Sequence, residues 1–206
     1  MKNLTGILLF SISLNVFATN VESPVSSVTE ESILGPNVVE TTVIDVNSVT
    51  MLLKNGATAT LSTTDDIHAS HGIHKAFDDN PGSHWTSKWS SYENFVLNGY
   101  RPSANANIDF DQAQRISKVS IRIHQITPRY ANGVGTPARI EIYGVDEYGN
   151  KTLKHESSID DAVTEWTDSD LLLEFVLDDP QTYDGYILKL SKGFNWTRFH
   201  TINLIP

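Results

Sequence analysis

The feature that most restricts the fold of this chain is a period of two in its apolar residues. In residues 119–124, Val, Ile and Ile alternate with Ser, Arg and His, and residues 138–143 repeat the alternation. Such a pattern places every second side chain on one face of a β-strand. Further strands are predicted at 171–177, 186–190 and 201–205, with turn residues between strands at 146–150, 178–180 and 192–193.

Helical signals are almost absent from the chain. The sequence predicts one short helix, near Ser70–Phe77, and contains no internal repeat. Many short strands with little helix are typical of a sandwich of two β-sheets. We therefore expect residues 50–206 to form one all-β, jelly-roll β-sandwich domain with at most one short helix.

The first eighteen residues have the layout of a secretory signal peptide. Lys2 supplies a positive charge, residues 7–14 form an apolar run, and Val16–Ala18 is a small-residue cleavage site. The apolar run is shorter than the ~20 residues of a transmembrane helix, and no later segment has the length and apolar character of one. We expect cleavage after Ala18 and a secreted or periplasmic protein.

Residues 19–49 contain no Lys or Arg and five acidic residues, and they are rich in Ser, Thr, Val and Pro. This composition is typical of an extended acidic leader or linker, with one strand predicted around Val38–Val46. The alternative is that these residues are the first part of the domain.

Two properties of the whole chain bear on its source and its partners. It has no cysteine, which in an exported protein indicates a bacterium. Its formal net charge of −10 argues against nucleic acid or anionic membranes as partners, because both require a cationic surface.

Residues 68–89 hold four His, two Asp and two Trp, a density that raises the question of a metal site. His68, His71 and His74 are three residues apart, which is less favourable for zinc than the i, i+4 pairs of zinc-binding helices. An HExxH motif is absent. We expect surface or packing roles for these histidines.

The second half of this stretch carries hard oxygen atoms on a tight turn. Asp78, Asn80 and Ser83 supply carboxylate, amide and hydroxyl oxygens around Pro81 and Gly82. Oxygen ligands on a loop favour calcium over zinc or copper. The alternative is an Asx-type turn without an ion.

Residues 76–85 resemble the A-x-D-G-N-x-x-T-x-W element of the discoidin, or F5/8 type C, domains, which include the family 32 carbohydrate-binding modules. The resemblance extends over about residues 55–206. Ile108–Phe110 is similar to the family's I-D-L strand and Ile116–Ile123 to the strand after it; residues 126–143 are similar to its x-P-R-x-D-G-x-N-G loop and Y-E-I-Y strand. The resemblance implies an eight-stranded, galactose-binding-like jelly roll with a structural calcium and a shallow sugar site on the loops at one end.

For the calcium, the resemblance implies a loop at residues 75–83 with Asp78, Asn80 and Ser83 as ligands. Family members close this site with a glutamate just before the last strand, a position that Thr201 occupies here. A weaker site, another last ligand and no ion are therefore open alternatives.

For the sugar, the resemblance implies an aromatic residue, an Arg and an Asn, which match Trp89, Arg129 and Asn132. An indole ring can stack on the C–H face of a pyranose while Arg and Asn bind its hydroxyls. The family's His falls on Thr86, so a preference for galactose does not carry over. For Arg129 the alternative is a salt bridge within the loop.

Two further residues are candidate ligand contacts, Tyr130 and Trp196. The alternative for Trp196 is a packing role beneath the sandwich. Trp85 directly follows the calcium turn, and we expect its indole in the core.

The function expected from these residues is a secreted, non-catalytic, lectin-like module that binds a glycan. An enzyme is a weaker alternative, because Glu93, Asp146, Glu147 and Asp161 stand in no motif of a catalytic acid, and a GxSxG motif and a Cys nucleophile are absent. The other alternative is a protein-interaction or adhesion module with the same fold and no sugar ligand.

Overall fold

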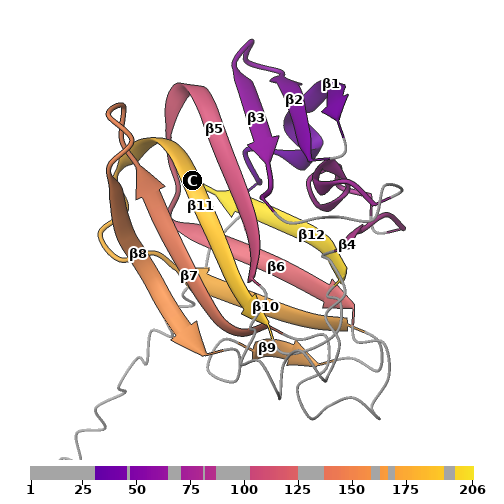
Figure 1. Ribbon diagram of the computed structural model, residues 1–206, viewed down its shortest axis with the longest axis vertical. Coiled ribbons are helices and arrows are strands. Elements are labelled where there is room, and N and C mark those ends of the chain that lie inside the picture. Colours follow the sequence, from indigo (N-terminus) through magenta and orange to yellow (C-terminus); the bar gives the residue numbers. More distant parts are fainter. Residues whose placement is uncertain are drawn as a thin grey trace, which may run out of the picture.

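The computed structural model of the chain describes residues 31–45, 47–64, 71–80, 82–86, 103–124, 137–158, 163–166, 170–192 and 198–206. Within these residues, two antiparallel sheets face each other, and the only helical elements are two single 3-10 turns (Figure 1). The all-β sandwich predicted from the sequence is confirmed. The described residues hold twelve strands rather than eight.

The larger sheet contains seven strands, in the order β1 (Val38–Asp45), β2 (Ser48–Leu53), β3 (Thr58–Ser62), β5 (Ser103–Arg115), β11 (Thr182–Lys192), β7 (Pro137–Val145) and β8 (Lys151–Ser158). The smaller sheet contains five, in the order β4 (Trp85–Thr86), β12 (Arg198–Ile205), β6 (Lys118–His124), β10 (Asp170–Val176) and β9 (Val163–Trp166). The two 3-10 turns are η1 (Gly35–Asn37) and η2 (Ile73–Ala76).

The core lies between the sheets and follows the alternation of the sequence. Val119, Ile121 and Ile123 of β6 are buried, as are Ile140 and Ile142 of β7. β-branched side chains of this kind suit strands because they pack well on a pleated surface. In β6 and β7 the period of two therefore predicts correctly which face of the strand meets the other sheet.

Two tyrosines of β11, Tyr183 and Tyr186, make close contacts inside the sandwich, and the ring of Tyr183 fits only because its neighbour is a glycine. Tyr183 lies against Gly144 of β7, where a Cβ would come within 2.5 Å of the ring. The buried hydroxyl of the neighbouring Tyr186 accepts a hydrogen bond from the backbone N–H of Ile116 at 3.0 Å. It lies 3.1 Å from the carbonyl oxygen of Gln114, to which it can donate. This hydroxyl ties β11 to the connection between β5 and β6.

The helix expected near Ser70–Phe77 is a single 3-10 turn, η2, in the part of this range that the structure describes. Gly72 precedes the turn, and two residues of the turn, Ile73 and Ala76, are buried. No helix among the described residues has the length and apolar character that a membrane crossing requires.

The described part of residues 19–49 packs with the domain. Leu34 is completely buried, and the backbone N–H of Ile33 donates to the carbonyl oxygen of Leu204 at 2.8 Å. The strand predicted around Val38–Val46 is β1, which pairs with β2 along its length. The border between residues 49 and 50 falls inside β2. These contacts agree with the alternative that the segment is the first part of the domain.

β1 forms the free edge of the larger sheet, and nearly all its residues are exposed. Val39, Val43 and Ile44 are each more than half exposed. A strand on an edge presents unpaired backbone groups on its outer side.

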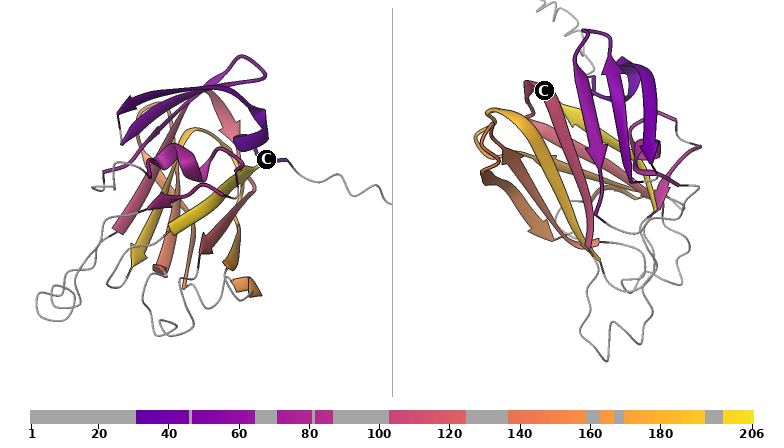
Figure 2. Two further views of the ribbon diagram at one scale, coloured as in Figure 1. Left: turned by 90° about the vertical axis from the view of Figure 1, so that its right-hand side faces the viewer. Right: turned by 45° about the horizontal axis from the view of Figure 1, so that its top comes forward.

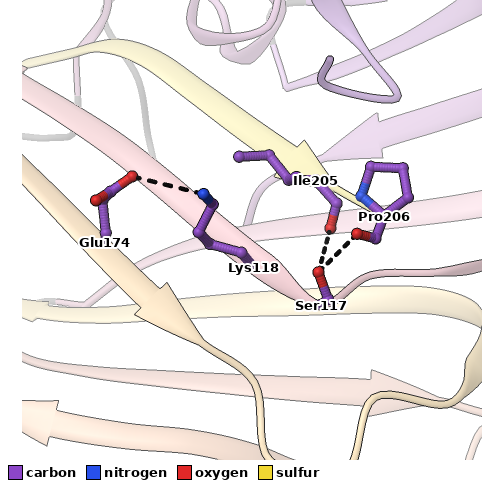
Figure 3. A network of polar contacts seen from close by, with 5 residues as sticks. All are labelled: Ser117, Lys118, Glu174, Ile205 and Pro206. Atoms are coloured by element: carbon purple, nitrogen blue, oxygen red, sulfur yellow. Dashed lines mark hydrogen bonds and ion pairs between the residues drawn. The ribbon is translucent and has the colours of Figure 1, made fainter. Parts of the chain in front are cut away.

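The C-terminus lies near the N-terminal strands in the views of Figures 1 and 2. Figure 3 shows how this end is held. The Ser117 hydroxyl, just before β6, lies 2.6 Å from the carbonyl oxygen of Pro206 and 3.5 Å from that of Ile205. The backbone N–H of Ser117 also donates to the Ile205 carbonyl oxygen, at 2.8 Å. Next to it, Lys118 and Glu174 form an ion pair between β6 and β10, with 3.9 Å between Nζ and Oε1.

Several strands end or begin at the same end of the sandwich, which we call the loop end. The register pairs Thr86 with Arg198, Ser103 with Ser191, and Pro137 with Lys192. Only five residues separate Lys192 of the larger sheet from Arg198 of the smaller one, a connection that spans at most about 22 Å. The segments 87–102, 125–136 and 193–197 are therefore all anchored at the loop end.

Candidate functional site

The loop predicted to bind calcium runs from η2 to β4. Phe77 and Trp85 are buried at its two ends, so both of its anchors belong to the core. Asp79 has a positive φ of 55°, the left-handed conformation for which glycine is usual. It occupies the position of the glycine in the family's A-x-D-G-N element. The backbone reaches the same turn with Asp, which is among the residues that tolerate this region.

The Ser83 hydroxyl lies at the centre of a group of oxygen atoms. Its Oγ is 2.8 Å from each carboxylate oxygen of Asp78, 3.0 Å from the carbonyl oxygen of Lys75 and 3.1 Å from that of Asn80. Four acceptor oxygens thus face one hydroxyl. The structure therefore brings Asp78, Asn80 and Ser83 together in one turn.

A hydroxyl has one hydrogen, so Ser83 can donate to only one of these four oxygens at a time. The other oxygens gain no hydrogen bond from it. Oxygens that ligate one calcium ion at 2.3–2.6 Å lie roughly 3 Å from one another. The chemistry and spacing of the group therefore fit calcium, with Ser83 Oγ, Asp78 and the carbonyls of Lys75 and Asn80 as the available ligands.

Asn80 serves the loop in two ways. Its side-chain Oδ1 accepts a hydrogen bond from the backbone N–H of Gly82 at 2.9 Å, so this oxygen closes the turn. Its backbone carbonyl is the atom that faces Ser83. The side chain predicted as a ligand is therefore used inside the turn, and the main chain supplies the oxygen.

The only carboxylate in this group of oxygens is that of Asp78. Among the described residues, no three His or carboxylate side chains converge on a common point as metal ligands. His74 lies near Asp78, and burial together with Lys75 lowers the pKa of its imidazole, although Asp78 acts in the opposite direction. The neutral form of His74 is thus favoured beside the loop.

Strand β12 contacts this loop through the ring of His200. The rings of His71 and His84 stack with 4.3 Å between their centroids, and the ring of His200 lies 5.6 Å from that of His84. Thr201, where the family has its closing glutamate, pairs with Arg122 next to an irregularity in β12. The sequence at this position supplies no carboxylate.

The predicted sugar contacts Trp89, Arg129, Tyr130, Asn132 and Trp196 all lie outside the described residues. Their flanking strands are described, and each of the three segments that carry them is anchored at the loop end. Trp85 is fully buried and stacks on Phe199 with 4.7 Å between ring centroids, which confirms the core position predicted for it.

Of the four carboxylates considered for catalysis, the structure describes Asp146 and Glu147. Asp146 closes the turn between β7 and β8, where its Oδ1 accepts from the backbone N–H groups of Tyr148 and Asn150. The Asn150 side chain donates to its other oxygen, and these bonds lower the pKa of the Asp146 carboxyl. This turn lies at the far end of β7 from the loop end, and Glu147 within it is exposed. Glu93 and Asp161 lie outside the described residues.

No protein-family model matches the chain, and no curated protein sequence matches it. Solved structures do match. The chain is similar to the family 32 carbohydrate-binding module of Clostridium perfringens NanJ in complex with galactose, with 19% identity and a TM-score of 0.50 over 72% of this chain and 93% of that one.

Two further solved structures are similar to the chain over a comparable share of its length. CpGH89CBM32-5 from Clostridium perfringens, in complex with GalNAc-β-1,3-galactose, is 14% identical with a TM-score of 0.50, over 72% of this chain and 95% of that one. The family 32 carbohydrate-binding module of Streptococcus pneumoniae EndoD is 15% identical with a TM-score of 0.50, over 71% and 94%. The chain has the β-sandwich fold of the family 32 carbohydrate-binding modules, and the resemblance seen in the sequence is confirmed at the level of the fold.

Proposed function

We propose that this chain is a non-catalytic carbohydrate-binding module that binds a glycan at the loop end. The observation that carries the proposal is the strand register, which pairs Thr86 with Arg198 and Pro137 with Lys192. Because these pairs anchor all three segments with predicted sugar contacts, an indole, a guanidinium and an amide can reach one ligand. The common fold with modules solved in complex with galactose or GalNAc-β-1,3-galactose supports a sugar as that ligand.

In the proposed site, Trp89 stacks on the apolar face of a pyranose, while Arg129 and Asn132 bind its hydroxyls. These roles follow from the two kinds of surface of a pyranose, an apolar C–H face that stacks on an aromatic ring and hydroxyls that form hydrogen bonds. Tyr130 and Trp196 are proposed as further walls of the site. The identity of the sugar is left open in this proposal, because Thr86 stands where galactose binders of the family have His.

We also propose that the loop at residues 75–83 binds one structural calcium ion that takes no part in chemistry. The four oxygens around Ser83 Oγ support this proposal. The ion would link η2 to the start of β4 and hold the root of the segment that carries Trp89. The first eighteen residues support export of the chain, with cleavage after Ala18.

A glycan array probed with the mature protein tests the sugar site. We expect defined glycan hits that weaken at least tenfold in Trp89→Ala and Arg129→Ala, since each removes a main contact. Tyr148→Ala is the matched control, because Tyr148 is an exposed aromatic residue at the far end of β7. A blank array with folded protein, or equal loss in the Tyr148→Ala variant, would contradict the proposal.

A second candidate function is a protein-interaction or adhesion module. The free edge of β1, with exposed Val39, Val43 and Ile44, is the observation that favours it. Exposed edge strands can pair with a strand of a partner. A pull-down that is lost in a Val43→Lys variant, together with a blank glycan array, would support this function over sugar binding.

A further inference from the structure

The outer face of the larger sheet contains a hollow of about 350 Å³. Its lining comes from four adjacent strands, β5, β11, β7 and β8, which lie side by side in Figure 1, and from Thr64 just after β3. The side chains that matter for its chemistry are Asn105, Asn107, Ile187, Lys189, Tyr143 and Lys151. This face points away from the core, and none of the predicted sugar contacts is among the residues that line the hollow.

The strand register arranges these side chains in two rows across the sheet. One row runs from Asn107 through Ile187 to Tyr143, which are direct cross-strand neighbours. Side chains that face each other in this way lie about 5 Å apart. The row therefore presents an amide beside an apolar surface made of an isoleucine and a tyrosine ring, at the spacing of one sugar ring.

The second row runs from Asn105 through Lys189 to Glu141. Glu141 lies on the outward face of β7, yet only 9% of it is exposed. Its carboxylate is 2.8 Å from Lys189 Nζ and 3.1 Å from Arg139 Nη2. The Tyr143 hydroxyl also bonds to it. These contacts hold Lys189 and Tyr143 against Glu141 in the absence of a ligand.

The charge of the hollow is opposite in sign to that of the chain. Its lining includes two lysines and no carboxylate, on a protein with a formal net charge of −10. Glu141 neutralises Lys189, whereas Lys151 has no carboxylate within ion-pair distance among the described residues. Asp109, the next outward residue of β5, does not line the hollow. An anion is therefore favoured next to Lys151.

We propose that this hollow is a second saccharide site that takes an acidic sugar, one that carries a carboxylate on its ring. The apolar row of Ile187 and Tyr143 receives the C–H face of the ring. Asn107 binds hydroxyls, since its amide both donates and accepts. The Asn105 amide donates to Thr64 Oγ1 at 3.1 Å, so Asn105 and Thr64 together form a polar wall of the hollow. Lys151 pairs with the carboxylate. The volume is within the usual range of small-ligand sites.

The test uses the full mature protein and NMR titration with short oligosaccharides of galacturonic, glucuronic and mannuronic acid. Carboxyl-reduced forms of the same oligosaccharides serve as neutral counterparts. We expect shift changes at the Ile187 methyl groups and at the side-chain amides of Asn105 and Asn107. Lys151→Ala should weaken binding of the acidic probe by about tenfold, the usual loss for a charged hydrogen bond. Asn107→Ala should weaken both forms.

Two controls separate this site from other causes of binding. Lys54→Ala removes the same charge from an exposed position outside the hollow and should leave binding unchanged. Trp89→Ala and Arg129→Ala should also leave it unchanged, so failure of the loop-end site and failure of this one are distinguishable. Equal binding of the carboxyl-reduced probes would overturn the acidic ligand. Absence of shifts at Ile187 with every probe, or equal loss in Lys54→Ala, would overturn the site.

Discussion

The Ser83 hydroxyl oxygen is equidistant from the two carboxylate oxygens of Asp78, at 2.8 Å from each. One hydroxyl hydrogen cannot serve both oxygens at once. The backbone N–H of Asn80 donates to Asp78 Oδ1 at 3.0 Å, which leaves Oδ2 as the oxygen that depends on Ser83. The same hydroxyl faces two backbone carbonyls. Calcium would replace these competing contacts with direct ligation.

Calcium should therefore stabilise the protein, and Asp78→Asn should abolish the effect. At a calcium concentration 100 times the Kd, the gain is about 2.7 kcal/mol, or roughly 5–10 °C in Tm for a chain of this size. Thermal unfolding with calcium and with a chelator measures it. Asp79→Asn is the matched control, because it removes a neighbouring charge and Asn also tolerates a positive φ. A Tm that is the same with calcium and with chelator in the unmodified protein would rule out the ion.

Leu34→Ala should destabilise the protein by about 2–4 kcal/mol, the usual cost of truncating a fully buried leucine. Leu34 is completely buried although it lies in a segment with the composition of a linker. Chemical denaturation measures the loss. Val39→Ala, at an exposed position of β1, should change stability by less than about 0.5 kcal/mol. Similar small effects in both variants would mean that residues 31–45 do not contribute to the folded domain.

Tyr186→Phe should cost about 1–3 kcal/mol, because the buried N–H of Ile116 loses its acceptor. Denaturant unfolding of the variant, beside Tyr148→Phe at an exposed position, tests this expectation. An unchanged midpoint in Tyr186→Phe would show that another acceptor replaces the hydroxyl.

Burial also raises the pKa of Tyr186 to about 12, above the value of 10.0 for an exposed tyrosine. The folded state then holds the phenol proton more tightly than the unfolded state. The stability that this group provides is complete below pH 10 and is lost as the pH rises toward 12. Stability measured across this interval should fall more steeply in the unmodified protein than in Tyr186→Phe. Parallel curves would contradict the assignment.

Glu141→Gln should destabilise the protein at neutral pH and have little effect in acid. The hydrogen bond from Lys189, with the charges of Lys189 and Arg139, lowers the pKa of the Glu141 carboxyl. A lowered pKa means that the stability is present above the ordinary range of a glutamate and is lost as the pH falls through the folded value. Tm curves of the two proteins should therefore converge at low pH. A difference in Tm that stays constant between pH 7 and pH 2 would show that the ion pairs of Glu141 are not the source of the stabilisation.

The sequence predicts the sandwich well because burial itself imposes the period of two. Val119, Ile121 and Ile123 are buried on the same face of β6, so the pattern follows directly from the burial of every second residue. Trp85 is a core residue for a related reason, since it directly follows a tight turn that leads into the smaller sheet.

Residues 38–45 were harder to assign because β1 has no buried face. Nearly every residue of this strand is exposed, so it carries the acidic and hydroxyl residues of a linker while it pairs with β2. The helix expected near Ser70–Phe77 is only the turn Ile73–Ala76, which follows Gly72.

The sequence predicts only some of the oxygen atoms that the candidate calcium loop brings together. Asp78 and Ser83 could be identified from their side chains, but the carbonyl oxygen of Lys75 has no sequence signal because every residue carries one. The sequence also did not predict the burial of Glu141, since Glu141 lies on the polar face of β7 and is covered by ion pairs with Arg139 of the same strand and Lys189 of β11. The contacts proposed for Trp89 and Arg129 remain predictions.

The bond between Ile33 and Leu204 joins residues at opposite ends of the chain, and the Ser32 hydroxyl accepts a second one from the same leucine. Strand β12 also lies between β4 and β6 inside the smaller sheet. During synthesis, the sandwich therefore cannot close before strand β12 has left the ribosome. Residues 32 and 33 find their partner in β12 about 170 residues further along the chain, and contacts of such long sequence separation make folding slow.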